Sequence, residues 1–213
     1  MKWAIHAPVN QPSGRFPMKR CSIVIHSVSG NCFIIGSYLK EALEKRNVDV
    51  RFYRVEDPDL HIWANKEETA NDYYEDIMEL PVVTPEKLLK SDMIIFGCPT
   101  RFGNMSAEMK VFIDSTVDMC EDHALEDKFF ACFTSCKYSL CEGSRALDSM
   151  IFWAQGNGMI HIPFGIHKEM PTCHQPVQGI AHLEGDESLV RPSAQLGDEI
   201  DAYAENLASY IQE

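Results

Sequence analysis

The sequence predicts an α/β domain built on a doubly wound parallel sheet. Short apolar segments alternate with longer segments of helical periodicity, the order expected of repeated β-α-β units. The apolar segments are continuous runs, which is typical of strands covered by helices on both faces. With 213 residues, 45% of them hydrophobic and 24% charged, the chain is long enough to form one large domain with its own core. No apolar run approaches the ~20 residues of a membrane span.

The expected strands and helices alternate along the chain. Strands are expected over residues 21–26, 48–53, 93–96, 129–133 and 159–162, and helices over residues 33–46, 107–117, 144–155 and 196–211. The connection over residues 55–91 is long for a β-α unit and includes a further expected helix over residues 67–80. Residues 166–195 are rich in Pro, Gly and His, so we expect an ordered loop over the top edge of the sheet.

We expect a single domain over residues 18–213, preceded by an N-terminal arm over residues 1–17. Trp3 and Phe16 would dock this arm on a neighbouring subunit, or the arm would pack on its own domain. Pro and Gly residues interrupt the arm, so it does not contain the apolar segment of a secretory signal. We therefore expect a cytoplasmic protein whose eight cysteines are reduced.

The charge of the chain limits its partners. The formal net charge is −13, which argues against nucleic acid or an anionic membrane as the main partner. Acidic residues are concentrated between Glu56 and Glu79. We interpret this segment as a solvated helical insert, in preference to a docking surface for a basic partner.

The turn Ser27–Cys32 joins the first expected strand to the first expected helix. Backbone N–H groups of such a turn and of the helix N-terminus converge on a small volume that favours an anion. Hydroxyl groups at Ser27 and Ser29 can add donors, and Gly30 lets the backbone approach a phosphate closely. The alternative is an ordinary helix N-cap, for which Ser29 or Asn31 would suffice.

A second candidate segment, Pro99–Ser106, follows the third expected strand directly. A buried strand that ends in a turn rich in Pro, Gly and Asn, and then continues as a helix, is typical of ligand sites at the carboxyl edge of α/β sheets.

This octapeptide, Pro-Thr-Arg-Phe-Gly-Asn-Met-Ser, resembles the flavin-contacting loop of the tryptophan-repressor-binding-protein family of NAD(P)H:quinone oxidoreductases, which are flavodoxin-like FMN proteins. The turn Ser27–Cys32 resembles the flavodoxin phosphate loop, with Cys32 in place of its last threonine. Segments around Thr84–Leu88, Asn157–Gly165 and Arg191–Ser193 are also similar to that family. The resemblance implies a five-stranded sheet in the order 2-1-3-4-5 with helices on both faces.

The resemblance also implies a cofactor and a set of residues that bind it. The cofactor is FMN, and the partners are NAD(P)H and a quinone-like acceptor, in a dimer or tetramer. The implied cofactor-binding residues are Ser27, Ser29, Gly30, Asn31, Cys32, Pro99, Thr100, Arg101, Phe102, Gly103, Asn104, Thr134, Ser135, Cys136 and Asn157. The chain departs from the family at residues 134–143, which lack the family's glycines, and at Asn157, where the family usually has histidine.

Three functions follow from these observations. The first is an FMN-dependent oxidoreductase that passes electrons from NAD(P)H to a quinone or similar acceptor. The second is an FMN electron carrier of flavodoxin type, and the third is a binding or scaffold protein that has lost the cofactor. We also consider that the Cys136 thiol tunes the flavin or pairs with Cys141 during turnover. No cysteine or histidine spacing predicts a metal site.

Overall fold

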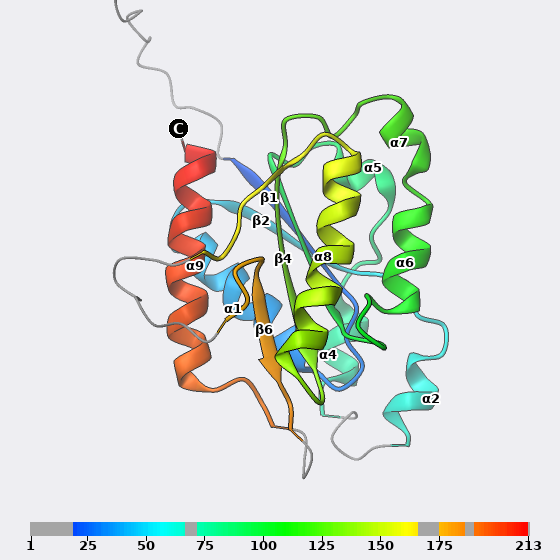
Figure 1. Ribbon diagram of the computed structural model, residues 1–213. Helices are drawn as coiled ribbons and strands as arrows, with labels where there is room; N and C mark the ends of the chain where they lie inside the picture. Colours follow the sequence, from blue (N-terminus) through cyan, green and yellow to red (C-terminus); the bar gives the residue numbers. More distant parts are fainter. Residues whose placement is uncertain (1–18, 67–71, 166–174, 186–189, 213) are drawn as a thin grey trace, which may run out of the picture.

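The computed structural model describes residues 19–66, 72–165, 175–185 and 190–212. The predicted arm, residues 1–17, lies outside these residues, as do Trp3 and Phe16. The described chain forms a parallel sheet with helices on both faces (Figure 1).

The sheet has the predicted strand order, β2-β1-β3-β4-β5. All of its pairings are parallel, and β1 and β3 are adjacent although a long connection separates them in sequence. This adjacency is the point at which the order of the strands reverses, where ligands of doubly wound sheets bind. The five strands are β1 (Arg20–Ile25), β2 (Asp49–Arg54), β3 (Met93–Pro99), β4 (Phe129–Cys136) and β5 (Ile160–His161).

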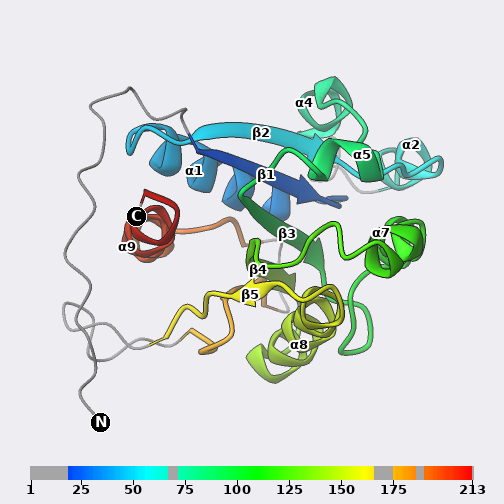
Figure 2. The same ribbon diagram turned by 90° about the horizontal axis from the view of Figure 1, so that it is seen from above.

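The two faces of the sheet bury separate hydrophobic cores. Alternate side chains of each strand point to opposite faces: Ile23 packs with α1 (Asn31–Glu44) and α9 (Ala194–Gln212). Val24 packs with α6 (Ala107–Asp114) and α8 (Leu140–Gly156). Helices α1 and α9 lie against each other, and α8 lies on the far side of the sheet from α9 (Figure 2).

The segment predicted as a loop over residues 166–195 contains a sixth strand, β6 (Ile180–Leu183). β3 occupies one edge of β4, so β5 and β6 share the other edge: β5 pairs with Phe129 and Phe130, and β6 pairs with residues 133–136. The short apolar run of β6 gave no strand signal because it stands among Pro, Gly and His residues. A Cβ on Gly179 would lie 2.2 Å from the carbonyl oxygen of Cys132, so only glycine allows this close approach.

Several helices differ from their predicted bounds. α1 begins at Asn31, two residues before the predicted start, so Asn31 and Cys32 belong to its first turn. The helix predicted over residues 107–117 ends at Asp114, and α7 (Val117–Glu121) follows it. The long connection contains α2 (Leu60–Ala64), α4 (Tyr74–Glu79) and α5 (Pro85–Leu88); residues 67–71 of the helix predicted over 67–80 lie outside the described residues. No helix in the described ranges is long and apolar enough to cross a membrane.

Candidate functional site

The candidate site lies at the carboxyl edge of the sheet, where the segments after β1, β3 and β4 come together. These strands are neighbours and run parallel, so the turns that follow them lie side by side. The structure therefore brings together the first two predicted groups of site residues, which are about seventy positions apart in the sequence, and adds Thr134, Ser135 and Cys136 at the end of β4.

The N-terminus of α1 faces this edge without a side-chain cap. Its N-cap residue is Gly30, with φ of 96°, a left-handed conformation that glycine adopts without strain. The Phe33 N–H donates to Ser27 Oγ at 3.2 Å, and no side chain caps the helix at its N-cap position. Backbone N–H groups at Asn31 and Cys32 are thus placed as donors for an anion.

Arg191 adds a cation to this turn. Its guanidinium donates to the carbonyl oxygen of Ser29 and, at 3.3 Å, to Oδ1 of Asn31. It also pairs with Asp72 at 3.3 Å and lies 4.8 Å from the centroid of the Tyr73 ring. The sequence analysis noted residues 191–193 only as part of the family resemblance, because nothing in the pattern indicates that they reach the turn after β1.

Tyr73 covers Gly30. A Cβ added to Gly30 would lie 2.4 Å from Cδ2 of the Tyr73 ring and 3.1 Å from an Arg191 nitrogen. Position 30 therefore requires glycine for two reasons, its positive φ and the ring packed against it. The acidic insert, interpreted from sequence as a solvated helix, contributes this ring to the edge of the candidate site.

The turn after β3 is held by backbone hydrogen bonds. Arg101 and Asn104 exchange two of them, Arg101 N–H to Asn104 O at 2.9 Å and Asn104 N–H to Arg101 O at 3.0 Å. Phe102, with φ of 51°, and Gly103, with φ of 72°, stand at its tip, and the Phe102 side chain is fully exposed. An aromatic ring held out from a strained tight turn is placed to contact a ligand.

A threonine pair joins the turns after β3 and β4. Thr100 Oγ1 and Thr134 Oγ1 are 2.9 Å apart, and the Thr134 hydroxyl donates to the carbonyl oxygen of Cys98 at 2.7 Å. The Thr100 N–H also donates to the Ser135 carbonyl oxygen at 2.8 Å. These contacts fix the relative positions of the two turns.

A hollow of about 510 Å³ lies beside the turn after β3 and the first turn of α6. It is lined by Arg101, Phe102, Asn104, Met105, Ala107, Glu108 and Lys110.

The cysteines of the predicted site point into the protein. Cys32 packs in the core, and burial raises the pKa of its thiol well above the usual value. Cys136 donates to the His182 carbonyl oxygen at 3.4 Å, and burial raises the pKa of its thiol to about 11. Cys141 is exposed in the first turn of α8, and no disulfide joins the described cysteines. A role for Cys32 in phosphate binding thus rests on its backbone N–H group.

Asn157 lies apart from the other predicted site residues. It caps the C-terminus of α8, where its side-chain amide donates to the Trp153 carbonyl oxygen at 2.9 Å. β5 follows at once and pairs with Phe129 and Phe130 at the start of β4. Asn157 therefore lies at the amino edge of the sheet, and the structure does not bring it to the turns after β1 and β3.

Sequence comparison agrees with this geometry. Residues 23–167 match the family described as NADPH-dependent FMN reductase, a range that covers both turns and most of the sheet. The chain belongs to this family. It is 31% identical over 153 residues to an NAD(P)H dehydrogenase (quinone) of Archaeoglobus fulgidus, covering 72% of this chain and 80% of that protein. It is also 31% identical over 144 residues to quinone-oxidoreductase QR2 of Triphysaria versicolor, covering 67% of this chain and 68% of that protein.

Solved structures support the flavodoxin-like fold. A WrbA-like flavodoxin protein from Agrobacterium tumefaciens superposes with a TM-score of 0.62 at 17% identity, covering 91% of this chain and 98% of that one. A flavodoxin from the domain Archaea gives 0.60 at 18% identity, with 91% and 99% covered. The predicted family and fold are therefore both confirmed.

Proposed function

We propose that this protein is an FMN-dependent oxidoreductase that passes electrons from NAD(P)H to a quinone or similar acceptor. The observation that carries the proposal is the N-terminus of α1, which has a glycine N-cap and no side-chain cap at the carboxyl edge of the sheet. The family match to NADPH-dependent FMN reductases and the two quinone-reducing relatives supply the reaction class.

The residues present fit FMN. Backbone N–H groups at Asn31 and Cys32, with the hydroxyl group of Ser29, would hold the phosphate. The Arg191 guanidinium donates to the Ser29 carbonyl oxygen in this structure. By moving from this oxygen to the phosphate, it would add a charge-assisted hydrogen bond. The turn Pro99–Asn104 would contact the flavin ring through its backbone, and the exposed Phe102 ring would exclude water from it. Thr134, Ser135 and the backbone of Cys136 would border the ring from β4.

FMN held by these residues would supply the chemistry of hydride and electron transfer between the nicotinamide and the acceptor. The protein binds and orients the reactants. The Thr100–Thr134 contact keeps the two ring-binding turns at a constant separation. Ser135 donates to Glu184 at 2.7 Å, which ties the segment after β6 to the same edge.

The proposal includes the oligomeric state and the cellular compartment of the protein. The family resemblance supports a homo-oligomer, and the exposed Phe102 and Tyr138 rings at the carboxyl edge are available to a neighbouring subunit. The free state of the described cysteines is consistent with a cytoplasmic protein. Light scattering coupled to size-exclusion chromatography would measure the oligomeric state.

The absorption spectrum of the purified protein, before and after incubation with FMN and dialysis, tests the cofactor. We expect an oxidised-flavin spectrum, and then oxidation of NADH or NADPH that depends on an added quinone. Flavin without nicotinamide oxidation would instead favour the electron carrier. A protein that retains no FMN would favour the scaffold.

The substitution Arg191→Gln tests the phosphate site directly. We expect the FMN affinity to fall about tenfold, about 1.4 kcal/mol, because a charge-assisted hydrogen bond is lost. Riboflavin, which has no phosphate, should bind the variant and the wild type equally. Arg51→Gln, which removes an exposed arginine paired with Asp49 on β2, is the matched control and should leave both affinities unchanged.

A further inference from the structure

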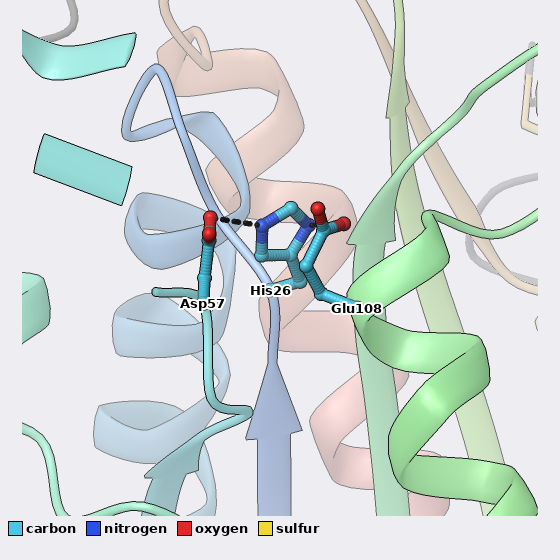
Figure 3. A group of neighbouring side chains, drawn as sticks. All are labelled: His26, Asp57 and Glu108. Carbon is cyan, nitrogen blue, oxygen red and sulfur yellow. Dashed lines mark hydrogen bonds and ion pairs between the residues drawn. The ribbon is translucent and has the colours of Figure 1, made fainter. Parts of the chain in front are cut away.

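A histidine between two carboxylates lies at the carboxyl edge, outside the proposed flavin contacts. His26 follows β1, Asp57 follows β2, and Glu108 lies in the first turn of α6 (Figure 3). His26 Nε2 is 3.0 Å from an Asp57 oxygen, and Nδ1 is 3.4 Å from a Glu108 oxygen. One ligand atom from each residue lies within 4.8 Å of the others.

The imidazole of His26 is buried with one nitrogen lacking a hydrogen bond. The His26 and Asp57 side chains are each only 4% exposed. Nε2 is hydrogen-bonded to Asp57, while Nδ1 is buried, has no hydrogen-bond partner and faces Glu108. Buried polar atoms without a partner are rare, and a site for an ion is one explanation of them.

The cluster joins one imidazole to two carboxylates. Nδ1 and the nearest Glu108 oxygen lie 3.4 Å apart without a hydrogen bond between them, and both atoms can serve as ligands of a cation. Among the ion pairs of the described residues, neither Asp57 nor Glu108 has a lysine or arginine partner. A cation between Nδ1 and Glu108 would bind both atoms and offset the negative charge of the carboxylates.

We propose that His26, Asp57 and Glu108 form a binding site for a divalent transition-metal ion, with Zn²⁺ as the best match. His26 Nδ1 and a Glu108 oxygen bind the ion directly. Asp57 accepts a hydrogen bond from the Nε2–H group and orients the imidazole, the carboxylate–histidine–metal arrangement found at many zinc sites. Water fills the remaining positions.

The separation of the two ligand atoms fits the ion. Two ligands bound at about 2.0–2.1 Å in tetrahedral geometry lie about 3.3–3.4 Å apart, which matches the 3.4 Å between Nδ1 and Glu108. A nitrogen ligand together with carboxylate oxygens also favours zinc over magnesium or calcium, which prefer oxygen alone.

Glu108 is the most exposed member of the cluster. Its side chain is 30% exposed, whereas His26 and Asp57 are almost fully buried. Glu108 also lines the hollow of about 510 Å³ beside the turn after β3. The Glu108 carboxylate therefore lies between the buried Nδ1 and a hollow at the surface.

The test is zinc binding by the full chain in the absence of flavin. Protein treated with a chelator and then freed of it is titrated with ZnCl₂ by calorimetry. We expect the wild type to bind one equivalent of zinc. Glu108→Gln should weaken it at least about 100-fold and Asp57→Asn about 10- to 100-fold, since one loses a ligand and the other the partner that orients the histidine.

Controls separate this site from other zinc ligands in the chain. Glu142→Gln, which changes a glutamate in the first turn of α8, should bind zinc like the wild type. Alkylation of exposed thiols should also leave the titration unchanged. The spectrum of the Co²⁺-loaded protein should show tetrahedral d–d bands without the intense near-ultraviolet absorption of a thiolate ligand.

Circular dichroism establishes that each variant folds before its titration is interpreted. A wild type that binds no zinc would overturn the proposal, as would variants at Glu108 and Asp57 that bind as tightly as the wild type. The proposal does not depend on FMN. Zinc binding by a protein that retains no flavin would support the zinc site and contradict the proposed function. Flavin binding by a protein that binds no zinc would contradict the zinc site and support the proposed function.

Discussion

Helices α1 and α8 both begin at the carboxyl edge of the sheet, and both have cysteine as their second residue. Their first turns nevertheless differ. α8 has Ser139 as its N-cap, with the side chain accepting from the Cys141 N–H at 3.0 Å, whereas α1 has Gly30 and no side-chain cap. Cys141 is exposed and Cys32 is buried. The N-cap side chain of α8 accepts from the second residue of its helix, whereas the N–H groups of Asn31 and Cys32 in α1 remain available to an anionic ligand.

The largest expected contrast is in thiol reactivity. Cys141 should be alkylated by iodoacetamide at mildly alkaline pH at least about 100 times faster than Cys32, which reacts only when its surroundings open. Burial raises the pKa of the Cys136 thiol to about 11, so that residue should also react slowly. Peptide mass spectrometry over a time course measures all three rates. Equal rates at Cys32 and Cys141 would contradict the difference between the two first turns.

The substitution Gly30→Ala should abolish the feature that distinguishes α1. A side chain at φ of 96° costs about 1–2 kcal/mol, and the new Cβ would lie within 2.4 Å of the Tyr73 ring. We expect a comparable loss of folding stability and a loss of FMN affinity of about tenfold or more. Urea unfolding and FMN fluorescence titration measure the two effects.

Gly197→Ala is the control for this substitution. Gly197 lies in α9 with no atom within 4 Å of an added Cβ. Alanine there should stabilise the protein by up to about 1 kcal/mol and leave FMN binding unchanged. Unchanged FMN affinity in Gly30→Ala would mean that the N-terminus of α1 does not hold the phosphate.

The substitution Ser139→Ala should have the opposite signature. It removes the cap of α8 and should cost about 1 kcal/mol of folding stability, while the FMN affinity changes less than about twofold. Ser149→Ala, in the same helix but away from its end, should be close to neutral. An FMN affinity that falls tenfold in Ser139→Ala would show that α8 also contributes its N-terminus to the cofactor.

The smallest effect concerns the other end of α1, where Arg46 pairs with Asp201 of α9 at 2.9 Å. The hydrogen bond from Arg46 lowers the pKa of Asp201. The pair therefore stabilises the folded protein above the ordinary pKa of 3.8, and this contribution is lost as the pH falls through the lower, folded value. Because the Asp201 side chain is 56% exposed, Asp201→Asn should cost less than about 1 kcal/mol at neutral pH. Unfolding at neutral and at acidic pH measures it, and a difference that grows in acid would contradict this assignment.

Much of the fold was predictable from the sequence because its central strands, such as β3 and β4, are nearly continuous apolar runs. Buried segments such as residues 93–96 have one interpretation in an α/β chain, and the octapeptide after them resembles one family closely. The positions of helix ends were less predictable. The local sequence does not show whether Asn31 is the last residue of the turn or the first residue of the helix.

The rest of the site depends on contacts between distant residues. Arg191 reaches Ser29, and Asp57 reaches His26 across 31 positions, through a fold that sequence periodicity does not describe. β6 was missed for a related reason. Its four residues form a strand because the edge of β4 beyond β5 is open to pairing, which is a property of the assembled sheet.

The division of the fifth strand position between β5 and β6 sets an order of assembly during synthesis. The N-terminal part of the chain is synthesised first, so the first four strands can pair with one another before β5 is added. At that stage the second half of β4 still has an open edge. That half contains Thr134, Ser135 and Cys136, and it is covered only when residues 180–183 arrive. The segment that we propose borders the cofactor is therefore among the last parts of the sheet to be completed, and until then it is an exposed edge open to pairing with other chains.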